Sequence, residues 1–324
     1  MSASDDARWM AGAIALSMRG RGRTAPNPNV GCLIVSDDRV IGRGWTQPGG
    51  RPHAEAMALA QAGPAAEDAT VYVTLEPCAH QSPRGPACVD LLLKARPARV
   101  VAALTDPDPR TAGAGFARLR EVGIEVVEGV DAAGAARAMA GFLTRQMFGR
   151  PHVTLKLAMS LDGGIAMANG RSRWITGPEA RAHAHLERAL ADLIVVGRGT
   201  LEYDKPTLNV RLRGLEDRAP TPVLLSMNEA DVPIGWLHIG VPSDISWLTG
   251  DYLLVEGGAE TAASFLSADY VDRLLLYRAP ILIGNARLLP GFGLSELQDA
   301  HDRWMIVDSR TLGSDRLEIY ERRR

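Results

Sequence analysis

The distribution of apolar residues along the first half of the chain predicts strands and helices in alternation. Short runs rich in valine, leucine and isoleucine are typical of strands, and longer segments with an apolar residue every three or four positions are typical of helices. We expect helices at residues 6–19, 53–62, 87–96 and 114–121, and strands at residues 31–35, 40–45, 69–75, 99–104 and 124–127. This alternation predicts a layered α/β domain.

A helical stretch at residues 131–148 ends this half, and Gly149-Arg150-Pro151 follows it as a break of the kind that joins domains. Beyond the break, a proline at the first helical position predicts a helix beginning at Pro178. Strands are expected at residues 152–159, 193–196, 253–255, 271–277, 303–308 and 316–320, the last two as an antiparallel hairpin through Thr311, Leu312 and Gly313. Because domains average about 150 residues, we predict one domain at residues 1–148 and another at residues 149–324.

Composition restricts the classes of function. Apolar residues make up 46% of the chain and charged residues 23%, which is enough for real hydrophobic cores. A net charge of −2 without a basic block does not indicate nucleic-acid binding. The sequence has no apolar run of the roughly 18 residues that a membrane helix needs, and its polar start lacks the regions of a signal peptide. We therefore expect a cytoplasmic protein that binds neither nucleic acid nor membrane.

The three cysteines suit a metal better than disulfides, because their number is small and odd. Cys32 lies in an apolar strand and is expected to be a core residue. Cys78 and Cys88 follow His53, and one imidazole with two thiolates can hold zinc while leaving its fourth position to water. Zinc lowers the pKa of that water to about 7, which makes hydroxide available at neutral pH.

Glu55, two residues after His53, gives this group a catalytic character. A carboxylate that is not a ligand can carry a proton from the water to a leaving amine. H-x-E followed by P-C and a second cysteine is the signature of zinc nucleobase deaminases. A histidine at a helix start is usually a surface residue and a lone cysteine there is usually structural, but their combination favours ligands at His53, Cys78 and Cys88.

Two loops accompany the candidate ligands. Residues 26–31, Pro-Asn-Pro-Asn-Val-Gly, fit neither a helix nor a central strand. The amide of Asn27 can donate to and accept from a pyrimidine edge, although a plain turn is the alternative. The segment between the cysteines, residues 79–87, is longer than the spacer of most zinc deaminases. Its His80 and Arg84 are candidates for contacting a phosphate or sugar, or are ordinary polar residues of an exposed loop.

Two glycine-containing turns follow predicted strands in the second half. The turn at residues 197–200 is weak evidence for a nucleotide. At residues 255–261 the glycines allow a phosphate to approach the backbone of a helix start, but a tight turn explains them as well. His183 and His185 point to different faces of their helix, so we expect ordinary polar positions rather than metal ligands.

The segments Pro26–Gly31, Pro52–Glu55, Thr74–His80 and Arg84–Cys88 resemble the bifunctional riboflavin-biosynthesis deaminase/reductase family. The resemblance continues to the C-terminus and implies a cytidine-deaminase-like three-layer domain followed by a dihydrofolate-reductase-like domain. It implies zinc-dependent hydrolytic deamination of 2,5-diamino-6-ribosylamino-4(3H)-pyrimidinone 5′-phosphate, followed by reduction of the ribosyl group to ribityl with NADPH. The expected partner is thus a small phosphorylated pyrimidine, and we expect a homo-oligomer.

The same resemblance implies roles for individual residues. In the first domain His53, Cys78 and Cys88 would hold zinc, Glu55 would shuttle protons, and Asn27 and His80 would contact the substrate. In the second domain the residues expected along NADPH are Ala158, Trp174, Thr200, Asp204, Ser226 and Gly258. Those expected to face the substrate are Ser172, Arg188, Leu208, Arg211 and Glu256, of which the two arginines suit a phosphate.

The chain departs from the family pattern at three places. The loop between the cysteines is one residue longer than the commonest form, Asp204 is followed by Lys205 instead of a second acid, and the segment between Ser226 and Glu256 is short. The short segment motivates an alternative function, a deaminase with an impaired or inactive reductase domain. A free-cytidine or tRNA deaminase and a non-catalytic zinc scaffold are further alternatives. The retained Glu55 argues against the scaffold, since structural zinc needs no such carboxylate and usually has four protein ligands.

Overall fold

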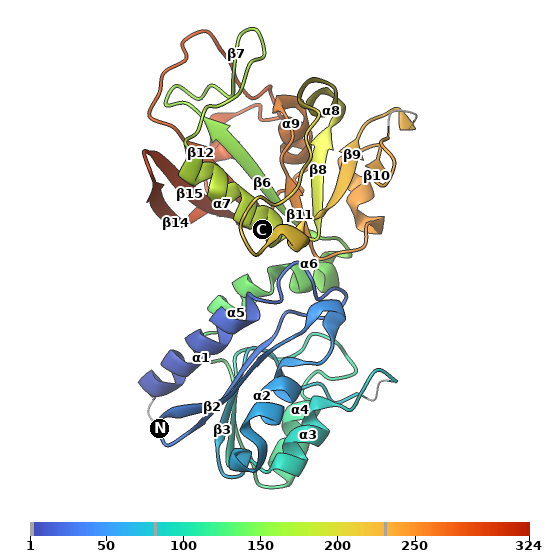
Figure 1. Ribbon diagram of the computed structural model, residues 1–324, viewed down its shortest axis with the longest axis vertical. Coiled ribbons are helices and arrows are strands. Elements are labelled where there is room, and N and C mark those ends of the chain that lie inside the picture. The colour runs from blue at the N-terminus through green and yellow to red at the C-terminus, as the bar shows by residue number, and fades with distance from the viewer. Residues whose placement is uncertain (1–2, 81–82, 230–231) are drawn as a thin grey trace. The chain divides into compact units, whose positions relative to one another are not determined.

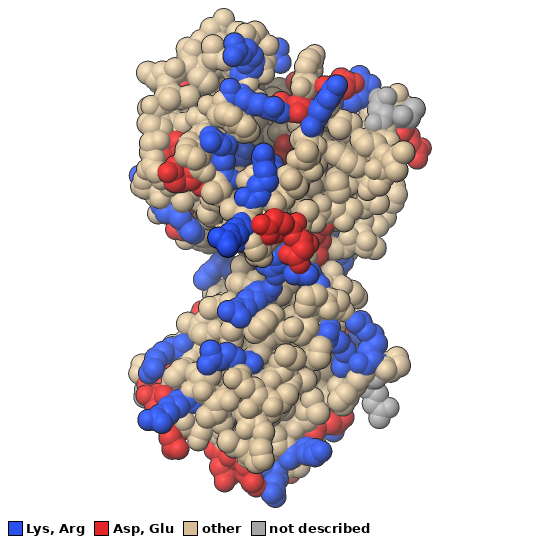
Figure 2. Space-filling view, viewed as in Figure 1, with Lys and Arg blue, Asp and Glu red and all other residues tan. Residues whose placement is uncertain are grey.

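The computed structural model describes residues 3–80, 83–229 and 232–324, and its chain folds into two compact units, Met1–Gly149 and Arg150–Arg324 (Figure 1). The division lies one residue beyond the expected boundary between residues 148 and 149. Among the described residues, no helix combines the length and the apolar character that crossing a membrane demands. On the face that Figure 2 shows, lysine and arginine side chains are interspersed with acidic ones.

The first unit is built on a five-stranded sheet with the order β2-β1-β3-β4-β5. The strand β1 pairs antiparallel with β2 and β3, and β3, β4 and β5 are parallel. Their bounds are β1 Gly31–Ser36, β2 Arg39–Trp45, β3 Thr70–Val73, β4 Arg99–Ala102 and β5 Glu125–Val127. All five expected strands are present, with ends that shift by one to a few residues.

Helices cover both faces of this sheet, α1 and α5 on one and α2, α3 and α4 on the other (Figure 1). Their bounds are α1 Ala3–Ser17, α2 Ala54–Ala62, α3 Cys88–Ala95, α4 Ala114–Glu121, α5 Ala132–Ala138 and α6 Ala140–Phe148. The helical stretch expected at residues 131–148 is present but divided into α5 and α6. The backbone at Met139 leaves the helical region at φ −109° and ψ 26°, so two helices meet there.

The close approach of α2 to the sheet requires glycine in β2. A Cβ atom at Gly44 would lie 2.1 Å from the carbonyl oxygen of Ala54, and one at Gly42 would lie 2.3 Å from that of Ala58. Real Cβ atoms do not approach a backbone oxygen this closely, so any other residue would push α2 outward. The first turn of α2, which carries the expected ligand His53 and Glu55, therefore owes its position to Gly44.

The second unit contains an eight-stranded sheet with the order β10-β9-β8-β11-β6-β12-β15-β14. The strands β10, β9, β8, β11, β6 and β12 all run parallel to one another. The hairpin of β15 and β14 pairs with β12 in the antiparallel direction. The bounds are β6 His152–Met159, β8 Leu193–Gly197, β9 Thr221–Leu225, β10 Leu237–Ile239, β11 Tyr252–Val255, β12 Arg273–Arg278, β14 Trp304–Leu312 and β15 Asp315–Arg322. The predicted hairpin is confirmed, but Leu312 pairs with Asp315, so its turn lies one or two residues later than expected.

The helices of the second unit are α7 Pro178–Ala189, α8 Arg198–Asp204 and α9 Ala259–Ser267. The short segment between Ser226 and Glu256 is not bare loop, since it contains β10 and a 3₁₀ turn at Pro242–Trp247. Two short strands, β7 Ala166–Met167 and β13 Ala286–Arg287, pair with each other outside the main sheet. The sequence pattern predicts neither β9 nor β10.

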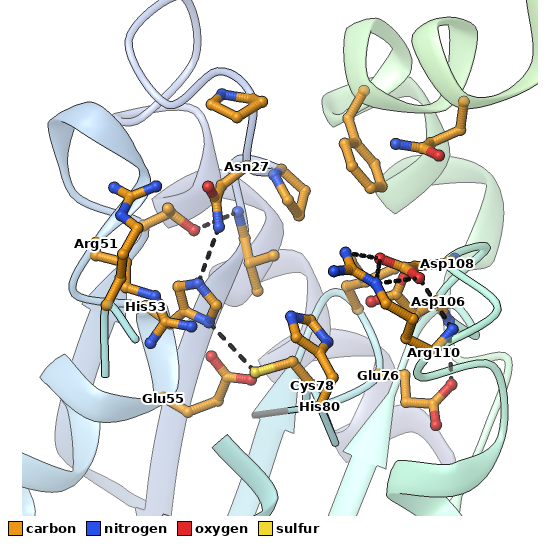
Figure 3. Close-up of a pocket in the computed structure, with 18 residues that line it drawn as sticks. Asn27, Arg51, His53, Glu55, Glu76, Cys78, His80, Asp106, Asp108 and Arg110 are labelled. Carbon is orange, nitrogen blue, oxygen red and sulfur yellow. Dashed lines mark hydrogen bonds and ion pairs between the residues drawn. The ribbon is translucent and has the colours of Figure 1, made fainter. Parts of the chain in front are cut away.

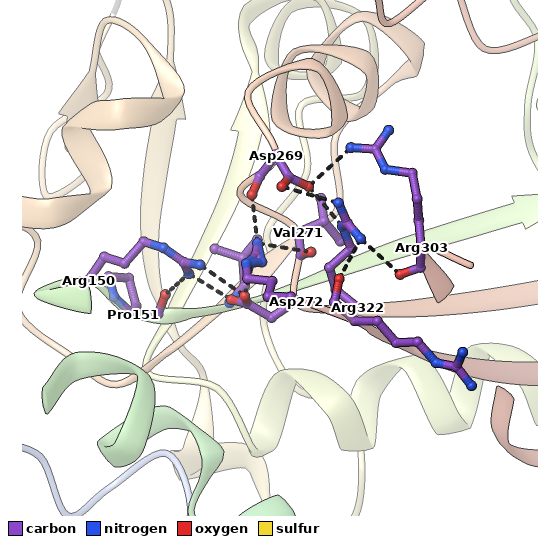
Figure 4. Close-up of polar contacts among 10 residues, drawn as sticks. Arg150, Pro151, Asp269, Val271, Asp272, Arg303 and Arg322 are labelled. Atoms are coloured by element: carbon purple, nitrogen blue, oxygen red, sulfur yellow. Dashed lines mark hydrogen bonds and ion pairs between the residues drawn. The ribbon is translucent and has the colours of Figure 1, made fainter. Parts of the chain in front are cut away.

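A buried ion pair anchors the beginning of β6 (Figure 4). The carboxylate of Asp272 accepts hydrogen bonds from both terminal nitrogens of Arg150, at 2.7 and 2.9 Å, and from the backbone N–H of Val153 at 2.8 Å. Burial alone would raise the pKa of Asp272, but the hydrogen bonds and charge of Arg150 outweigh it and the pKa lies below its usual range.

Candidate functional site

Three predicted ligands from separate elements converge in the first unit. His53 is the N-cap of α2, Cys88 is the first residue of α3, and Cys78 lies in the loop after β3. One nitrogen of His53, Nδ1, lies 3.3 Å from Sγ of Cys88 and 3.6 Å from Sγ of Cys78, and the three ligand atoms lie within 4.8 Å of one another. A tetrahedral zinc site places nitrogen and sulfur about 3.5 Å apart, so the donor set fits zinc.

The other nitrogen of His53, Nε2, is 3.1 Å from the side-chain amide of Asn27. A histidine that binds a metal through one nitrogen usually gives its second N–H to a neighbouring acceptor, which fixes the orientation of the ring. In the structure the amide nitrogen of Asn27, Nδ2, is the atom next to Nε2, and turning the amide over by 180° would present its oxygen to a metal-bound His53 instead. The structure thus places Asn27, an expected substrate contact, beside a ligand.

The environment of the two cysteines favours thiolate at Cys78. The hydrogen bond with the Cys88 thiol is the main cause that lowers the pKa of Cys78, and the backbone N–H of Cys88 donates to its sulfur at 3.3 Å. The same hydrogen bond, together with burial, raises the pKa of Cys88. A cation binds thiolates rather than thiols and would draw the remaining proton away from Cys88.

Glu55 lies in the first turn of α2, and its side chain is buried next to the ligands (Figure 3). Burial raises the pKa of Glu55 to about 7, and Cys78 adds to the rise while His53 opposes it. A pKa near the ambient pH suits a group that must both accept and donate a proton. The charge of a bound cation would bring this pKa down.

These side chains open onto a cavity of about 350 Å³ (Figure 3). A volume of this size is typical of a small-molecule site. Of the expected site residues, Asn27, His53, Glu55, Cys78 and His80 line it, and so does the candidate Arg84. His80 lies 3.2 Å from the hydroxyl of Thr111 through its Nδ1. Gln81 and Ser82, in the same predicted loop, lie outside the described residues.

Sequence reasoning missed part of the cavity wall. Asp106, Asp108 and Arg110 come from the loop after β4, and Phe142 and Gln146 come from α6. Burial raises the pKa of Asp106 to about 6. The only signal in the sequence is the Asp-Pro-Asp-Pro turn at residues 106–109, which follows a strand that ends at the same edge of the sheet as β3.

In the second unit, the residues expected along NADPH follow the carboxyl ends of neighbouring parallel strands. Ala158 lies near the end of β6, Thr200 follows β8, Ser226 follows β9 and Gly258 follows β11. The backbone N–H of Gly258 donates to the hydroxyl of Thr200 at 3.1 Å, which joins two of these turns. Ligands of open α/β sheets bind in crevices at this edge.

The remaining two residues expected along NADPH lie outside these turns. Trp174 is exposed, with the guanidinium of Arg181 4.8 Å from the centre of its ring. Asp204 ends α8 and pairs with Arg173 at 3.2 Å. Ser172 of the expected substrate-facing set is also exposed and precedes this pair in the chain.

The other expected substrate-facing residues form a connected group. Arg188 donates to both carboxylate oxygens of Glu256, at 2.7 and 2.9 Å, and to the carbonyl oxygen of Asn209 at 3.0 Å. Arg211 is exposed and donates to His185 at 3.2 Å, while Leu208 is buried with a positive φ of 51°. Because Glu256 accepts hydrogen bonds from two nitrogens of the Arg188 guanidinium, Arg211 is the arginine more accessible to a substrate phosphate.

The comparisons with known proteins cover both units. Residues 3–104 match the zinc-binding region of cytidine and deoxycytidylate deaminases, and residues 151–235 and 248–317 match the RibD C-terminal domain. The riboflavin biosynthesis protein RibD of Escherichia coli K12 is 37% identical, over 96% of this chain and 97% of the relative. That of Mycobacterium tuberculosis H37Rv is 37% identical, over 94% of each chain.

Solved structures match along the whole chain. Acinetobacter baumannii RibD, form 1, has a TM-score of 0.88 at 35% identity and covers 100% of both chains. A diaminohydroxyphosphoribosylaminopyrimidine deaminase/5-amino-6-(5-phosphoribosylamino)uracil reductase from Thermotoga maritima has a TM-score of 0.89 at 31% identity over 99% of both chains. The alignment with the Escherichia coli relative spans 361 positions, more than the 324 residues of this chain, so that relative has residues without a counterpart here.

Proposed function

The chain belongs to the RibD family of bifunctional riboflavin-biosynthesis deaminase/reductases, and from that premise we propose how its two units divide the work. Residues 1–148 deaminate the diaminopyrimidine ribosylamino phosphate, and residues 149–324 then reduce its ribosyl group to ribityl with NADPH. The observation that carries the proposal is the group of His53, Cys78 and Cys88 with a buried Glu55 beside it, all at one cavity.

In the deaminase unit, His53, Cys78 and Cys88 would hold zinc, which when bound would make a water acidic enough to attack at neutral pH. Glu55 accepts the proton of that water and passes it to the departing amino group, which leaves as ammonia. Asn27 holds the His53 ring through Nε2, 3.1 Å away, and His80 lies on the cavity wall where the polar part of the substrate enters. The apolar side chains of the cavity wall, which include Leu75 and Phe142, keep the pyrimidine ring in place for the attack.

In the reductase unit, NADPH supplies the hydride, and the chain positions cofactor and substrate. Thr200, Ser226 and Gly258 lie along the cofactor at the carboxyl ends of the strands, with Ala158, Trp174 and Asp204 beside them. Glu256 and Arg188 form a fixed pair at the substrate, and Arg211 offers its guanidinium to the phosphate. Ser172 and Leu208 complete the substrate contacts.

We propose that the protein works in the cytoplasm as a homo-oligomer on a small-molecule substrate, without nucleic acid or membrane as a partner. The coupled reaction tests the function. Purified protein is analysed for zinc, and ammonia release is measured with the diaminopyrimidine substrate. The deaminated product is then supplied with NADPH, and absorbance at the nicotinamide band is followed. Ammonia release followed by steady NADPH oxidation is expected.

The short segment between Ser226 and Glu256 favours one alternative, a deaminase with an impaired reductase. Under that alternative, ammonia is released at a normal rate while NADPH is not oxidised when the deaminated product is added. The presence of β9 beside β8, with β10 paired to β9 at the edge of the sheet, supports the bifunctional proposal, because β8 and β9 carry the turns with Thr200 and Ser226.

A further inference from the structure

Glu76 directly precedes Pro77 and the ligand Cys78, yet its buried carboxylate points toward another loop (Figure 3). Its Oε2 accepts hydrogen bonds from the backbone N–H groups of Asp106 and Gly113, at 3.1 and 2.9 Å. Its Oε1 accepts from those of Gly115 and Phe116, at 2.9 and 3.4 Å. One side chain thus satisfies four backbone donors. Loss of these hydrogen bonds would destabilise the fold, because the donors are buried or partly buried and would lose their partner.

Three of these donors belong to the start of α4. The first N–H groups of a helix have no partner within the helix, and Gly113, the N-cap of α4, has no side chain to serve them. The carboxylate of Glu76 takes the place of a capping side chain, and its negative charge suits the positive end of the helix dipole. A Cβ atom at Gly115 would lie 2.4 Å from the carbonyl oxygen of Pro77 and 3.0 Å from Glu76 Oε1. Only glycine at this position therefore lets the start of α4 lie so close to Glu76 and Pro77.

The loop at residues 106–113 is therefore fastened at both of its ends by one carboxylate. Between these ends it supplies Asp106, Asp108 and Arg110 to the cavity wall. Asp106 accepts from the backbone N–H of Asp108 at 2.9 Å, and Asp108 forms an ion pair with Arg110. The hydroxyl of Thr111, in the same loop, contacts His80 at 3.2 Å.

We propose that Glu76 is a positioning residue of the deaminase, which sets the placement of the cavity wall that faces the substrate. Glu76 also lines the cavity, but both of its carboxylate oxygens are occupied by backbone N–H donors, so its effect is exerted through the loop at residues 106–113. The inference rests on the proposed deaminase function. If the loop shifts, substrate binding is weakened, whereas zinc binding and proton transfer by Glu55 remain, because both depend on α2, α3 and Cys78.

The test compares Glu76→Gln with wild type, both as full-length protein loaded with zinc. The amide has the same shape but replaces one acceptor oxygen with a donor, so two backbone donors lose their partner. We expect kcat/KM for ammonia release to fall about 10- to 100-fold, mainly through a higher KM, since small misplacements in an active site have effects of this size. Zinc content and NADPH oxidation should stay at wild-type values.

Two further variants sharpen the comparison. Glu67→Gln removes the same charge from the same unit, at an exposed residue paired with Arg96, and should leave KM unchanged. Asp106→Asn alters the cavity wall itself. If Glu76 acts through this loop, Glu76→Gln combined with Asp106→Asn loses less activity than the product of the two single effects.

Several results would overturn the inference. These are an unchanged KM in zinc-loaded Glu76→Gln, a fall in kcat alone that follows a loss of zinc, or independent effects in the double variant. If Glu76→Gln does not fold, Glu76→Asp is measured by the same criterion, and failure of both to fold would make Glu76 a folding residue only. Absence of ammonia release from the wild-type protein would instead refute the proposed function.

Discussion

The two nitrogens of His53 face different partners, and this division defines the deaminase site at the scale of single residues. Nδ1 lies among the sulfurs of Cys78 and Cys88, and Nε2 faces Asn27. The sequence pattern identifies the ligands and Glu55, because their spacing is a signature of the chemistry. It does not reveal that Asn27 contacts His53, since 26 residues separate the two in the chain.

Asn27→Ala should weaken zinc binding, because the His53 ring loses the neighbour that holds its orientation. Loss of such an outer partner typically costs about 10- to 100-fold in metal affinity or activity. Competition with a chromophoric chelator measures the zinc affinity. An unchanged affinity with a raised KM would show that Asn27 serves only the substrate.

Glu55→Gln should abolish ammonia release while zinc stays bound. The amide cannot accept the proton of the attacking water, and general acid–base catalysis is worth about 10²- to 10⁴-fold in rate. Ammonia release and zinc content are measured on the same sample. Turnover close to wild type would contradict the role of Glu55 as the proton carrier.

At the scale of elements, helix starts and strand ends place the functional groups. His53 and Cys88 lie at the starts of α2 and α3, and the positive end of each helix favours thiolate at the site. Gly44 lets α2 approach the sheet, and Glu76 fastens the loop before α4. In the second unit, the ion pair of Arg150 with Asp272 joins the beginnings of β6 and β12.

The stability of the second unit should depend on pH through Asp272. Its pKa in the folded protein lies below the unfolded value of about 3.9, so its contribution is complete above about pH 5 and is lost as the pH falls further. At pH 7, Asp272→Asn should cost about 3–5 kcal/mol, because it leaves Arg150 buried without its ionic partner.

The free energy of unfolding is measured in urea, with hydrogen exchange of amides in peptides from β6 and β12 as the probe. Wild type should lose stability between pH 5 and pH 3, and Asp272→Asn should lose distinctly less over the same range. Asp299→Asn, at an exposed position, is the matched control and should behave like wild type. Equal losses in the Asp272 variant and wild type would disprove the contribution of the ion pair.

At the scale of the whole molecule, the two chemistries are assigned to separate units. All three zinc ligands lie within residues 1–149, and all residues assigned to NADPH lie within residues 150–324. Each unit has its own sheet and its own hydrophobic core. The chemistry of one unit should therefore survive the loss of the cofactor of the other.

Removal of zinc should stop ammonia release and leave NADPH oxidation intact when the deaminated product is supplied. Protein treated with a chelator and then dialysed is assayed for both activities, and zinc is added back to restore the first. A parallel loss of NADPH oxidation that zinc restores would contradict the independence of the two reactions.

The sequence by itself determined the alternation of elements, the zinc ligands and Glu55, because these depend on local periodicity and on short spacings. It did not reveal β9, β10 or the break at Met139, where local patterns are weak. The tertiary structure alone decided which distant segments meet at the sites: Asn27 with His53, Glu76 with the start of α4, and Arg188 with Glu256. Such contacts depend on how strands order themselves in a sheet, and no local pattern of residues records that order.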